Sequence, residues 1–350
     1  MNKAEINRNI LVIFNLKTDR NDPLLAFTIT WINEFASKVD QVWVYSTHIG
    51  EYNLANNVKL YELGGGSIHS RFLALCKLFR VGLQVVKKRR NAIVFHHMSI
   101  KTASILGIFF KMFLIPQALW YSHSNVTLEL KMAAHFVDLI FSSTPHSLPI
   151  KTKKGQFIGH GIDTTSFQEF SNKKRLDDIL SLGRISHIKN NEALIYALAN
   201  TNRKNRTVHL VGPLLTDTSY LVNLIKYGKD LGVAVEYLGS ISHEEIPNLV
   251  QNYSICYTGN PNTVDKSVIE GAMGGCFTLA SQEFILEQTG TKEILNMSGI
   301  EFTNDISEQI EIFDKLANRN DLRIALSKIA KEKNDIRNLA TKILDELRKL

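Results

Sequence analysis

The stretch that decides the fold runs from Val233 to Ser281: VAVEYLGSISHEEIPNLVQNYSICYTGNPNTVDKSVIEGAMGGCFTLAS. Short apolar runs alternate in it with segments of helical pattern, in the order strand, helix, strand, helix, strand. Ser242 and Glu245 have the spacing of a capping box at the start of the first helix. The second helix is expected to begin near Asp265, and its small residues allow close packing on a sheet. The stretch therefore predicts a doubly wound sheet of parallel strands.

Two loops in this stretch leave the carboxyl ends of strands, one after Leu238 and one after Gly259. Ligands of doubly wound sheets bind at that edge. The second loop leads into a helix N-terminus, where free N–H groups and the helix dipole hold anions. Glu270 lies one turn into this helix, and Lys266 and Ser267 lie at its start. We expect the carboxylate to suit ribose hydroxyls, and the helix start with Lys266 to suit phosphate oxygens.

A second chemical signal lies in SLGRISHIKN, residues 181–190. A strand ends at Leu182, and Arg184 and Lys189 follow in one loop before a helix. A planar arginine fork and a lysine point charge near a strand end can together neutralise a diphosphate leaving group. A basic surface loop is the alternative interpretation of the same residues.

Together these stretches resemble the donor-sugar site of the retaining glycosyltransferases of family 4, which have the GT-B fold. The family motif is a Glu, seven residues, a second Glu at the head of a helix, and Ala-Met-Ala-Xaa-Gly. Glu270 and the following GAMGG match its second part, whereas the first Glu falls on Asn262, an amide without charge. The family's Gly-Arg and Lys-Asn pattern is matched by Gly183, Arg184, Lys189 and Asn190.

The resemblance implies roles for further residues. Gly239, Ser240 and Ile241 stand where the family recognises the nucleotide base through backbone groups, although an ordinary turn explains them equally well. His123 closes the strand LWYS, where a family histidine contacts the donor sugar and the acceptor side. A satisfied or merely exposed histidine is the alternative there. The resemblance is strongest from Gly159 to Ser281 and weak before Trp120.

Length and composition are those of a globular protein of about two domains. The chain has 350 residues, 44% of them hydrophobic, and a formal net charge of +7, which favours an anionic partner. Its three cysteines form no CxxC pair and are interpreted as buried thiols. No signal peptide opens the chain, and the apolar run 103–115 is too short to span a bilayer. We expect a cytoplasmic protein, free or peripheral at the inner face of the cell membrane.

Strands alternating with helices over residues 10–162 predict a Rossmann-like first domain, 1–165, assigned by resemblance to the acceptor. We expect residues 166–334 to form a second, nucleotide-sugar domain, and residues 164–178 are the candidate linker. By resemblance the two face a central cleft, and a terminal helix, 335–350, packs on the first; a solvated tail or partner surface is the alternative. The glycine run 64–66 lacks the continuation of a dinucleotide-binding or P-loop motif.

The segment Arg71–Arg90 predicts an amphipathic helix with a basic end. Its functional interpretation is docking on anionic lipid, and its alternative is a core helix with a solvated basic end. Nucleic acid is disfavoured as a partner because aromatic residues do not alternate with these charges. No Asp-Xaa-Asp pair occurs in the sequence, so we expect no metal in the donor site.

The resemblance implies a retaining, metal-independent glycosyltransferase that needs no cofactor. It would move a hexose from a UDP- or GDP-sugar to a glycan or lipid-linked acceptor in bacterial surface polysaccharide or lipopolysaccharide synthesis. Two alternatives remain open. One is a catalytically silent nucleotide-binding subunit, which Asn262 suggests, and the other is a nucleotide-sugar 2-epimerase of the same fold.

Overall fold

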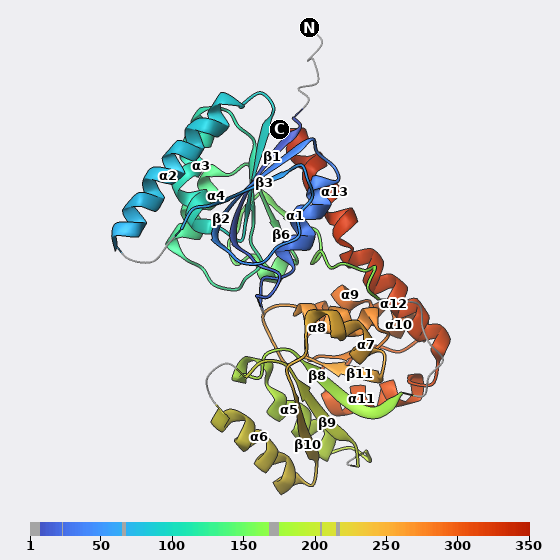
Figure 1. The fold of residues 1–350 in the computed structure, drawn as a ribbon. Helices are drawn as coiled ribbons and strands as arrows, with labels where there is room; N and C mark the ends of the chain where they lie inside the picture. Colours follow the sequence, from blue (N-terminus) through green and yellow to red (C-terminus); the bar gives the residue numbers. More distant parts are fainter. Residues whose placement is uncertain (1–7, 23, 65–67, 168–174, 204, 215–217) are drawn as a thin grey trace. The chain divides into compact units, whose positions relative to one another are not determined.

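A computed structural model describes residues 8–22, 24–64, 68–167, 175–203, 205–214 and 218–350, without the side chains of residues 68–75. The contacts divide the chain into two compact units. The first comprises Met1–Asp163 with Asp335–Leu350, and the second comprises Thr164–Asn334. Each unit is built on its own parallel sheet (Figure 1).

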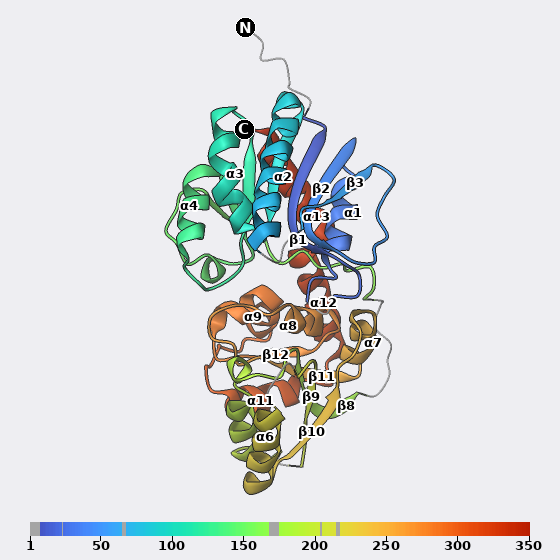
Figure 2. The same cartoon turned by 60° about the vertical axis from the view of Figure 1, so that its left-hand side comes forward.

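The first unit contains a seven-stranded parallel sheet in the order β3-β2-β1-β4-β5-β6-β7. Its central strands are apolar on both faces because helices cover both. One face carries α1 and α13, and the other carries α2, α3 and α4 (Figure 2). The bounds are β1 Ile10–Thr18, α1 Thr28–Ala36, β2 Gln41–Ile49, β3 Val58–Glu62, α2 Ile68–Lys87, β4 Ala92–His97, α3 Ile100–Met112, β5 Gln117–Trp120, α4 Leu128–Phe136, β6 Leu139–Ser142, β7 Gly155–Phe157 and α13 Ile336–Arg348.

Helix α13 belongs to the core of the first unit although it ends the chain. Its buried stripe, which includes Leu339 and Leu344, packs in one cluster with Trp31 and Phe35 of α1. Figure 1 shows the two helices side by side. The Trp31 indole N–H donates to the carbonyl of Gly161 over 2.9 Å, and Gly161 has a φ of +63°. The segment 335–350 is therefore a packed element and not a solvated tail.

The second unit contains a five-stranded parallel sheet in the order β10-β9-β8-β11-β12. A helix joins each strand to the next, as the alternating pattern predicts. The bounds are β8 Leu176–Leu182, α5 Asn191–Ala199, β9 Thr207–Val211, α6 Thr218–Leu231, β10 Ala234–Gly239, α7 Ile246–Val250, β11 Tyr253–Tyr257, α8 Lys266–Met273, β12 Phe277–Leu279, α9 Glu283–Thr289, α10 Thr291–Met297, α11 Ile306–Leu316 and α12 Asn320–Asn334.

Each sheet begins in its middle and grows to both sides. In the first unit β1 lies between β2 and β4, and in the second β8 lies between β9 and β11. The strand order therefore reverses beside β1 and beside β8, and at such a point the loops at the carboxyl edge diverge and leave a crevice.

Three details differ from the sequence-based expectations. Helix α2 ends at Lys87, so residues 88–90 of the predicted basic helix form a turn. Cys76 is exposed, whereas Cys256 and Cys276 are buried as predicted. Strand β8 begins at Leu176, inside the predicted linker. Residues 168–174 of that linker and residues 65 and 66 of the glycine run lie outside the described residues. No helix among the described residues is long and apolar enough to cross a membrane.

Candidate functional site: the carboxyl edge of the second sheet

Three glycines with positive φ follow or end the strands β8, β9 and β10: Gly183, Gly212 and Gly239. A side chain at Gly212 would collide with the chain of Gly183, because its Cβ would lie 2.1 Å from the Gly183 carbonyl oxygen. The Gly212 N–H donates to the carbonyl of Gly239 over 2.9 Å. Bare backbone therefore runs along this edge, which allows a ligand to approach it closely.

Lys189 follows β8 and forms an ion pair with Asp265, the residue before α8. Its Nζ lies 2.8 Å from the Asp265 carboxylate, and only 8% of Lys189 is exposed. Thr258 and Asn260 also donate to this carboxylate, over 2.9 and 3.3 Å. Burial alone would raise the pKa of Asp265, but Lys189 and these hydrogen bonds hold that pKa below its usual range. The pair ties the loop after β8 to the loop after β11, across the point where the strand order reverses.

The same ion pair leaves the start of α8 open. Asp265 occupies the N-cap position, where a carboxylate normally accepts hydrogen bonds from the first helical turn. Its side chain makes no such bond because it faces Lys189, Thr258 and Asn260 instead. The first N–H groups of α8 are thus not capped by Asp265, and such groups bind anions.

Gly183, Lys189 and Ser267 converge beside this helix start. A Cβ at Gly183 would lie 3.0 Å from the Lys189 Nζ and 3.3 Å from the Ser267 Oγ. The Ser267 hydroxyl is buried and has no hydrogen-bond partner among the described residues. A buried hydroxyl normally has a partner, so this one is available to a ligand. The structure brings these three predicted residues together.

Lys266 at the start of α8 and Glu270 one turn further along form a second charged group. Glu270 is 3% exposed, and burial raises the pKa of its carboxyl against the opposing charges of His243 and Lys266. The His243 Nδ1 lies 3.7 Å from the Glu270 carboxylate. Burial also lowers the pKa of Lys266 to about 7, although Glu270 opposes this. Lys266 therefore titrates near neutral pH, unlike an ordinary lysine.

The remaining predicted residues of this unit lie on the surface of the same edge. Arg184 is exposed, directly after Gly183. Asn262 is exposed in the loop before α8, and its backbone N–H donates to Asn260 over 3.1 Å. Ser240 and Ile241 follow β10, where Ser240 is exposed and Ile241 is partly exposed. The structure thus places Arg184 at the site without burying it, in contrast to Lys189.

Sequence reasoning did not select Asp265 or His243 as site residues. Asp265 was expected only as a helix start, and its pairing with Lys189 joins residues 76 positions apart. His243 lies in the short helix whose capping box the sequence predicted, and that box is present. The signal that the sequence offered for Asp265 is its position as a charged residue at the N-cap of α8, directly before Lys266.

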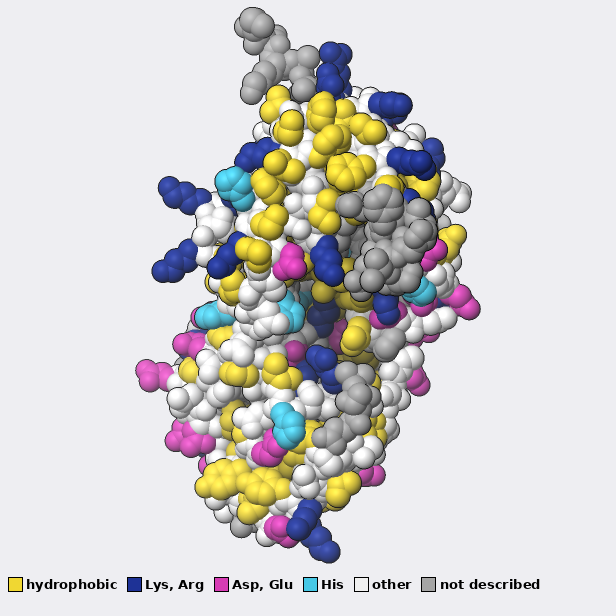
Figure 3. All heavy atoms as spheres, turned by 90° about the vertical axis from the view of Figure 1, so that its left-hand side faces the viewer, with side chains coloured by type: hydrophobic (Ala, Val, Ile, Leu, Met, Phe, Trp, Pro, Cys, Tyr) yellow, Lys and Arg dark blue, Asp and Glu magenta, His cyan; other side chains and the backbone are white. Residues whose placement is uncertain are grey.

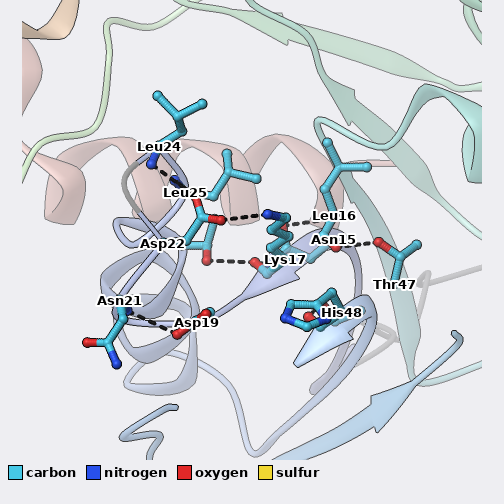
Figure 4. Close-up of polar contacts among 12 residues, drawn as sticks. Asn15, Leu16, Lys17, Asp19, Asn21, Asp22, Leu24, Leu25, Thr47 and His48 are labelled. Carbon is cyan, nitrogen blue, oxygen red and sulfur yellow. Dashed lines mark hydrogen bonds and ion pairs between the residues drawn. The ribbon is translucent and has the colours of Figure 1, made fainter. Parts of the chain in front are cut away.

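In the first unit, polar side chains gather where β1 and β4 end. Asn15 organises this edge: its side-chain amide donates to the carbonyl of Lys17 over 2.6 Å and to the Thr18 hydroxyl over 3.2 Å. His97 Nδ1 lies 3.3 Å from the Asn15 side-chain oxygen. Lys17 pairs with Asp22 over 2.7 Å, which fixes the loop between β1 and α1 (Figure 4). This edge is ordered by its own polar contacts.

His123, the predicted catalytic histidine, lies after β5 at the same edge of the first unit. It is exposed, and its ring Nδ1 accepts a hydrogen bond from the backbone N–H of Asn125 over 3.2 Å. The backbone N–H of His123 donates to the Ser147 carbonyl over 3.0 Å. His96 by contrast is fully buried, and burial lowers its pKa to about 3. Of these two histidines, only His123 is accessible to a ligand.

No group of three or more His, Cys, Asp or Glu side chains with metal-site geometry occurs in the described parts of the chain. No protein-family model matches the sequence, and no curated protein matches it.

Solved structures with the same fold include several glycosyltransferases. HepE from Anabaena in complex with UDP and glucose is 15% identical, with 97% of this chain and 99% of that chain covered and a TM-score of 0.66. A glycosyltransferase from Rickettsia africae is 13% identical, with 97% and 98% covered and a TM-score of 0.70. The lipopolysaccharide outer core galactosyltransferase WaaB is 11% identical, with 96% and 99% covered and a TM-score of 0.63.

A protein from Listeria monocytogenes assigned as a candidate UDP-N-acetylglucosamine 2-epimerase is also similar. It is 13% identical, with 96% of this chain and 95% of that chain covered and a TM-score of 0.56. These likenesses extend over nearly the whole chain, and the two parallel sheets agree with them. The chain therefore has the GT-B fold, as its sequence predicted.

Proposed function

We propose that the protein transfers a sugar from a nucleoside diphosphate sugar to an acceptor hydroxyl, as a retaining enzyme of the kind that its sequence resembles. The observation that carries this proposal is the open start of α8. Its N-cap carboxylate is turned away to Lys189, and the buried Ser267 hydroxyl has no partner among the described residues. A diphosphate supplies the negative charge and acceptor oxygens that such a site lacks.

In this proposal the diphosphate is bound by the start of α8, Ser267 and Arg184. Arg184 is exposed and supplies a positive charge, whereas the charge of Lys189 is largely balanced by Asp265. Lys189 then has a positioning role: it keeps the Asp265 carboxylate away from the helix start. As the glycosidic bond breaks, the leaving diphosphate gains charge, and the positive groups stabilise it. Glu270 would bind the ribose hydroxyls.

The likeness to HepE, solved with UDP and glucose, and to WaaB, a galactosyltransferase of lipopolysaccharide, supports a UDP-hexose donor and a bacterial glycan or lipid-linked acceptor. We assign His123 to the sugar or the acceptor, since it is accessible at the carboxyl edge of its sheet. Backbone groups of residues 239–241 would contact the base. The proposed transfer needs no cofactor and no metal, so activity should survive a chelator.

A thermal-shift panel of UDP-, GDP-, ADP- and CMP-sugars tests donor binding first. A true donor raises the unfolding midpoint in a concentration-dependent way. At a hundred times its Kd it adds about 2.7 kcal/mol to the free energy of unfolding. Arg184→Ala should weaken this effect, while Lys229→Ala, an exposed cation of α6, should not. If no sugar nucleotide shifts the midpoint, or if Arg184→Ala leaves the shift unchanged, the proposal is wrong.

A silent nucleotide-binding subunit is the second candidate, because Asn262 stands where the family has a carboxylate. Such a protein binds the donor but transfers nothing to a panel of acceptors, and Asn262→Glu would then give it measurable turnover. The epimerase alternative predicts a new sugar nucleotide in the absence of any acceptor, which chromatography of the reaction mixture detects.

A further inference from the structure

One side of the first unit exposes several large apolar side chains, which proteins normally bury in the core. Helix α3 has two apolar stripes: Leu106 and Phe110 point into the core, while Ile108 and Met112 point outward. A helix on a protein surface normally has one apolar stripe and a polar outer face. Helix α13 of the same unit follows that rule, since its exposed residues are polar. The outer stripe of α3 therefore needs another explanation.

The neighbouring helices extend this stripe into a face. Its most exposed apolar members are Leu114 at 85%, Met112 at 73%, Leu128 at 71%, Leu83 at 55%, Phe79 at 50% and Ile108 at 48%. They come from α2, α3 and α4, except Leu114, which follows the end of α3. We call this set the α2–α4 face. Figure 3 shows hydrophobic side chains gathered on this side of the unit, with Lys and Arg side chains around them.

The face is continuous because its helices pack closely. A Cβ at Gly82 of α2 would lie 3.0 Å from the ring of Phe109 in α3. A Cβ at Gly107 of α3 would lie 2.9 Å from the Cβ of Phe136 in α4. The glycines thus bring the three helices together, and their outer side chains form one surface. A contiguous exposed apolar surface with a polar rim marks an interaction site.

The charge of this region shows which partner fits. Residues 63–137 contain ten Lys and Arg but a single carboxylate, Glu129, whereas the rest of the chain contains 31 Lys and Arg and 33 Asp and Glu. Every Lys and Arg from Lys77 to Lys131 is exposed. The net positive charge of the protein is therefore concentrated in the elements that carry the α2–α4 face, and it attracts a negatively charged partner.

From these observations we infer that the α2–α4 face docks on an anionic lipid bilayer. Cations at the rim bind lipid headgroups, while Met112, Leu114 and Leu128 enter the boundary between headgroups and acyl chains. Nucleic acid would use the cations but gain nothing from exposed Met and Leu side chains. An acidic protein would match the charge, but a lipid surface alone offers anions and hydrocarbon together over such an area. All residues of the face belong to the first unit, so the inference does not depend on the donor site.

Sedimentation with lipid vesicles tests this docking. We expect the protein to bind vesicles of one part phosphatidylglycerol to two parts phosphatidylcholine, and to bind phosphatidylcholine alone far more weakly. A triple variant of the apolar residues, Met112→Ser, Leu114→Ser and Leu128→Ser, should lose at least tenfold in affinity. Its matched control replaces exposed apolar residues of the second unit, Val222→Ser, Ile225→Ser and Ile324→Ser, and should bind as the unmodified protein does.

A second triple variant, Lys87→Gln, Lys88→Gln and Arg89→Gln, separates the electrostatic part. Each Lys or Arg near an anionic surface contributes enough that losing three should lower the affinity by about a hundredfold. For insertion itself, Met112→Trp should give a tryptophan emission that shifts to the blue on vesicles and is quenched by brominated acyl chains. Val222→Trp in α6 should show neither effect.

Three results would overturn the inference. The first is no binding to anionic vesicles. The second is equal binding by the apolar variant and its control, which would mean that hydrocarbon contacts play no part. The third is an unmodified protein that self-associates through these residues and leaves the vesicles unbound, since the face would then be an interface between copies of the chain.

Discussion

Lys266 has a pKa of about 7, so about half of the protein molecules carry a charged Lys266 at neutral pH. A diphosphate bound at the start of α8 would favour the charged form and raise that pKa. Donor binding should therefore take up a proton. The two phosphates of a sugar nucleotide are diesters and do not titrate near neutral pH, so the proton must be taken up by the protein.

The size of the effect follows from this pKa. If the bound state raises the pKa to about 9, uptake is about half a proton at pH 7 and about 0.8 at pH 8. Affinity is highest below the pKa of the free protein and falls as the pH rises, by about tenfold between pH 6 and pH 8. The affinity falls with rising pH because the ligand binds the charged form of Lys266, which is lost as the pH rises through its pKa.

Isothermal titration calorimetry measures this uptake directly. The best donor of the thermal-shift panel is titrated at one pH in two buffers with different ionisation enthalpies, and the difference in heat gives the protons bound. Lys266→Arg stays charged throughout, so its uptake and its pH dependence should vanish. Lys229→Arg in α6 is the control and should behave as the unmodified protein. If the unmodified protein takes up no proton, or if Lys266→Arg takes up as many, Lys266 is not the group that gains the proton.

Three further predictions concern packing and the ion pair. Gly183→Ala should weaken donor binding, because its Cβ would lie 3.0 Å from the Lys189 Nζ and 3.3 Å from the Ser267 Oγ. Gly232→Ala, with positive φ but nothing within 4 Å, should cost about 1–2 kcal/mol of stability and leave binding intact. Lys189→Met leaves the Asp265 carboxylate without its ion-pair partner and should lower the free energy of unfolding by about 3 kcal/mol in urea titrations. The double variant with Asp265→Asn should recover much of this loss. A loss below about 1 kcal/mol would contradict a buried pair. Leu344→Ala should cost about 3 kcal/mol and exposed Lys342→Ala under about 0.5, whereas equal losses would mean that α13 does not belong to the core.

Much of the fold was predictable because most of the strands contain a short apolar run bounded by polar or glycine residues. The sequence predicts strands at residues 10–14, 92–97 and 254–259, and the structure has β1, β4 and β11 at these places, with β1 extended to Thr18 and β11 at Tyr253–Tyr257. The helix that begins after Asp265 was predicted as well. The end of α2 was predicted wrongly. Basic residues such as 88–90 are favourable at a helix C-terminus, so the sequence predicts that the helix includes them. The chain instead turns there to enter β4, and the charges of these residues do not indicate that turn.

The site was predictable in its residue types but not in its pairing. The sequence selected Lys189 and Ser267 from their places beside strands, and the structure brings both to Gly183. It could not show that Lys189 is held by Asp265, because that contact depends on how two loops on neighbouring strands meet. This ion pair balances the charge of Lys189, so Arg184 supplies the positive charge for a ligand. It also leaves the start of α8 uncapped by Asp265.

The central claim is that the start of α8, with Ser267 and Arg184, holds the diphosphate of the donor. A crystal structure of the protein with UDP measures this most directly. We expect diphosphate oxygens within hydrogen-bond distance of the Ser267 hydroxyl and the first N–H groups of α8, with the Arg184 guanidinium turned toward them. A diphosphate bound elsewhere, with the start of α8 left to water, would contradict it.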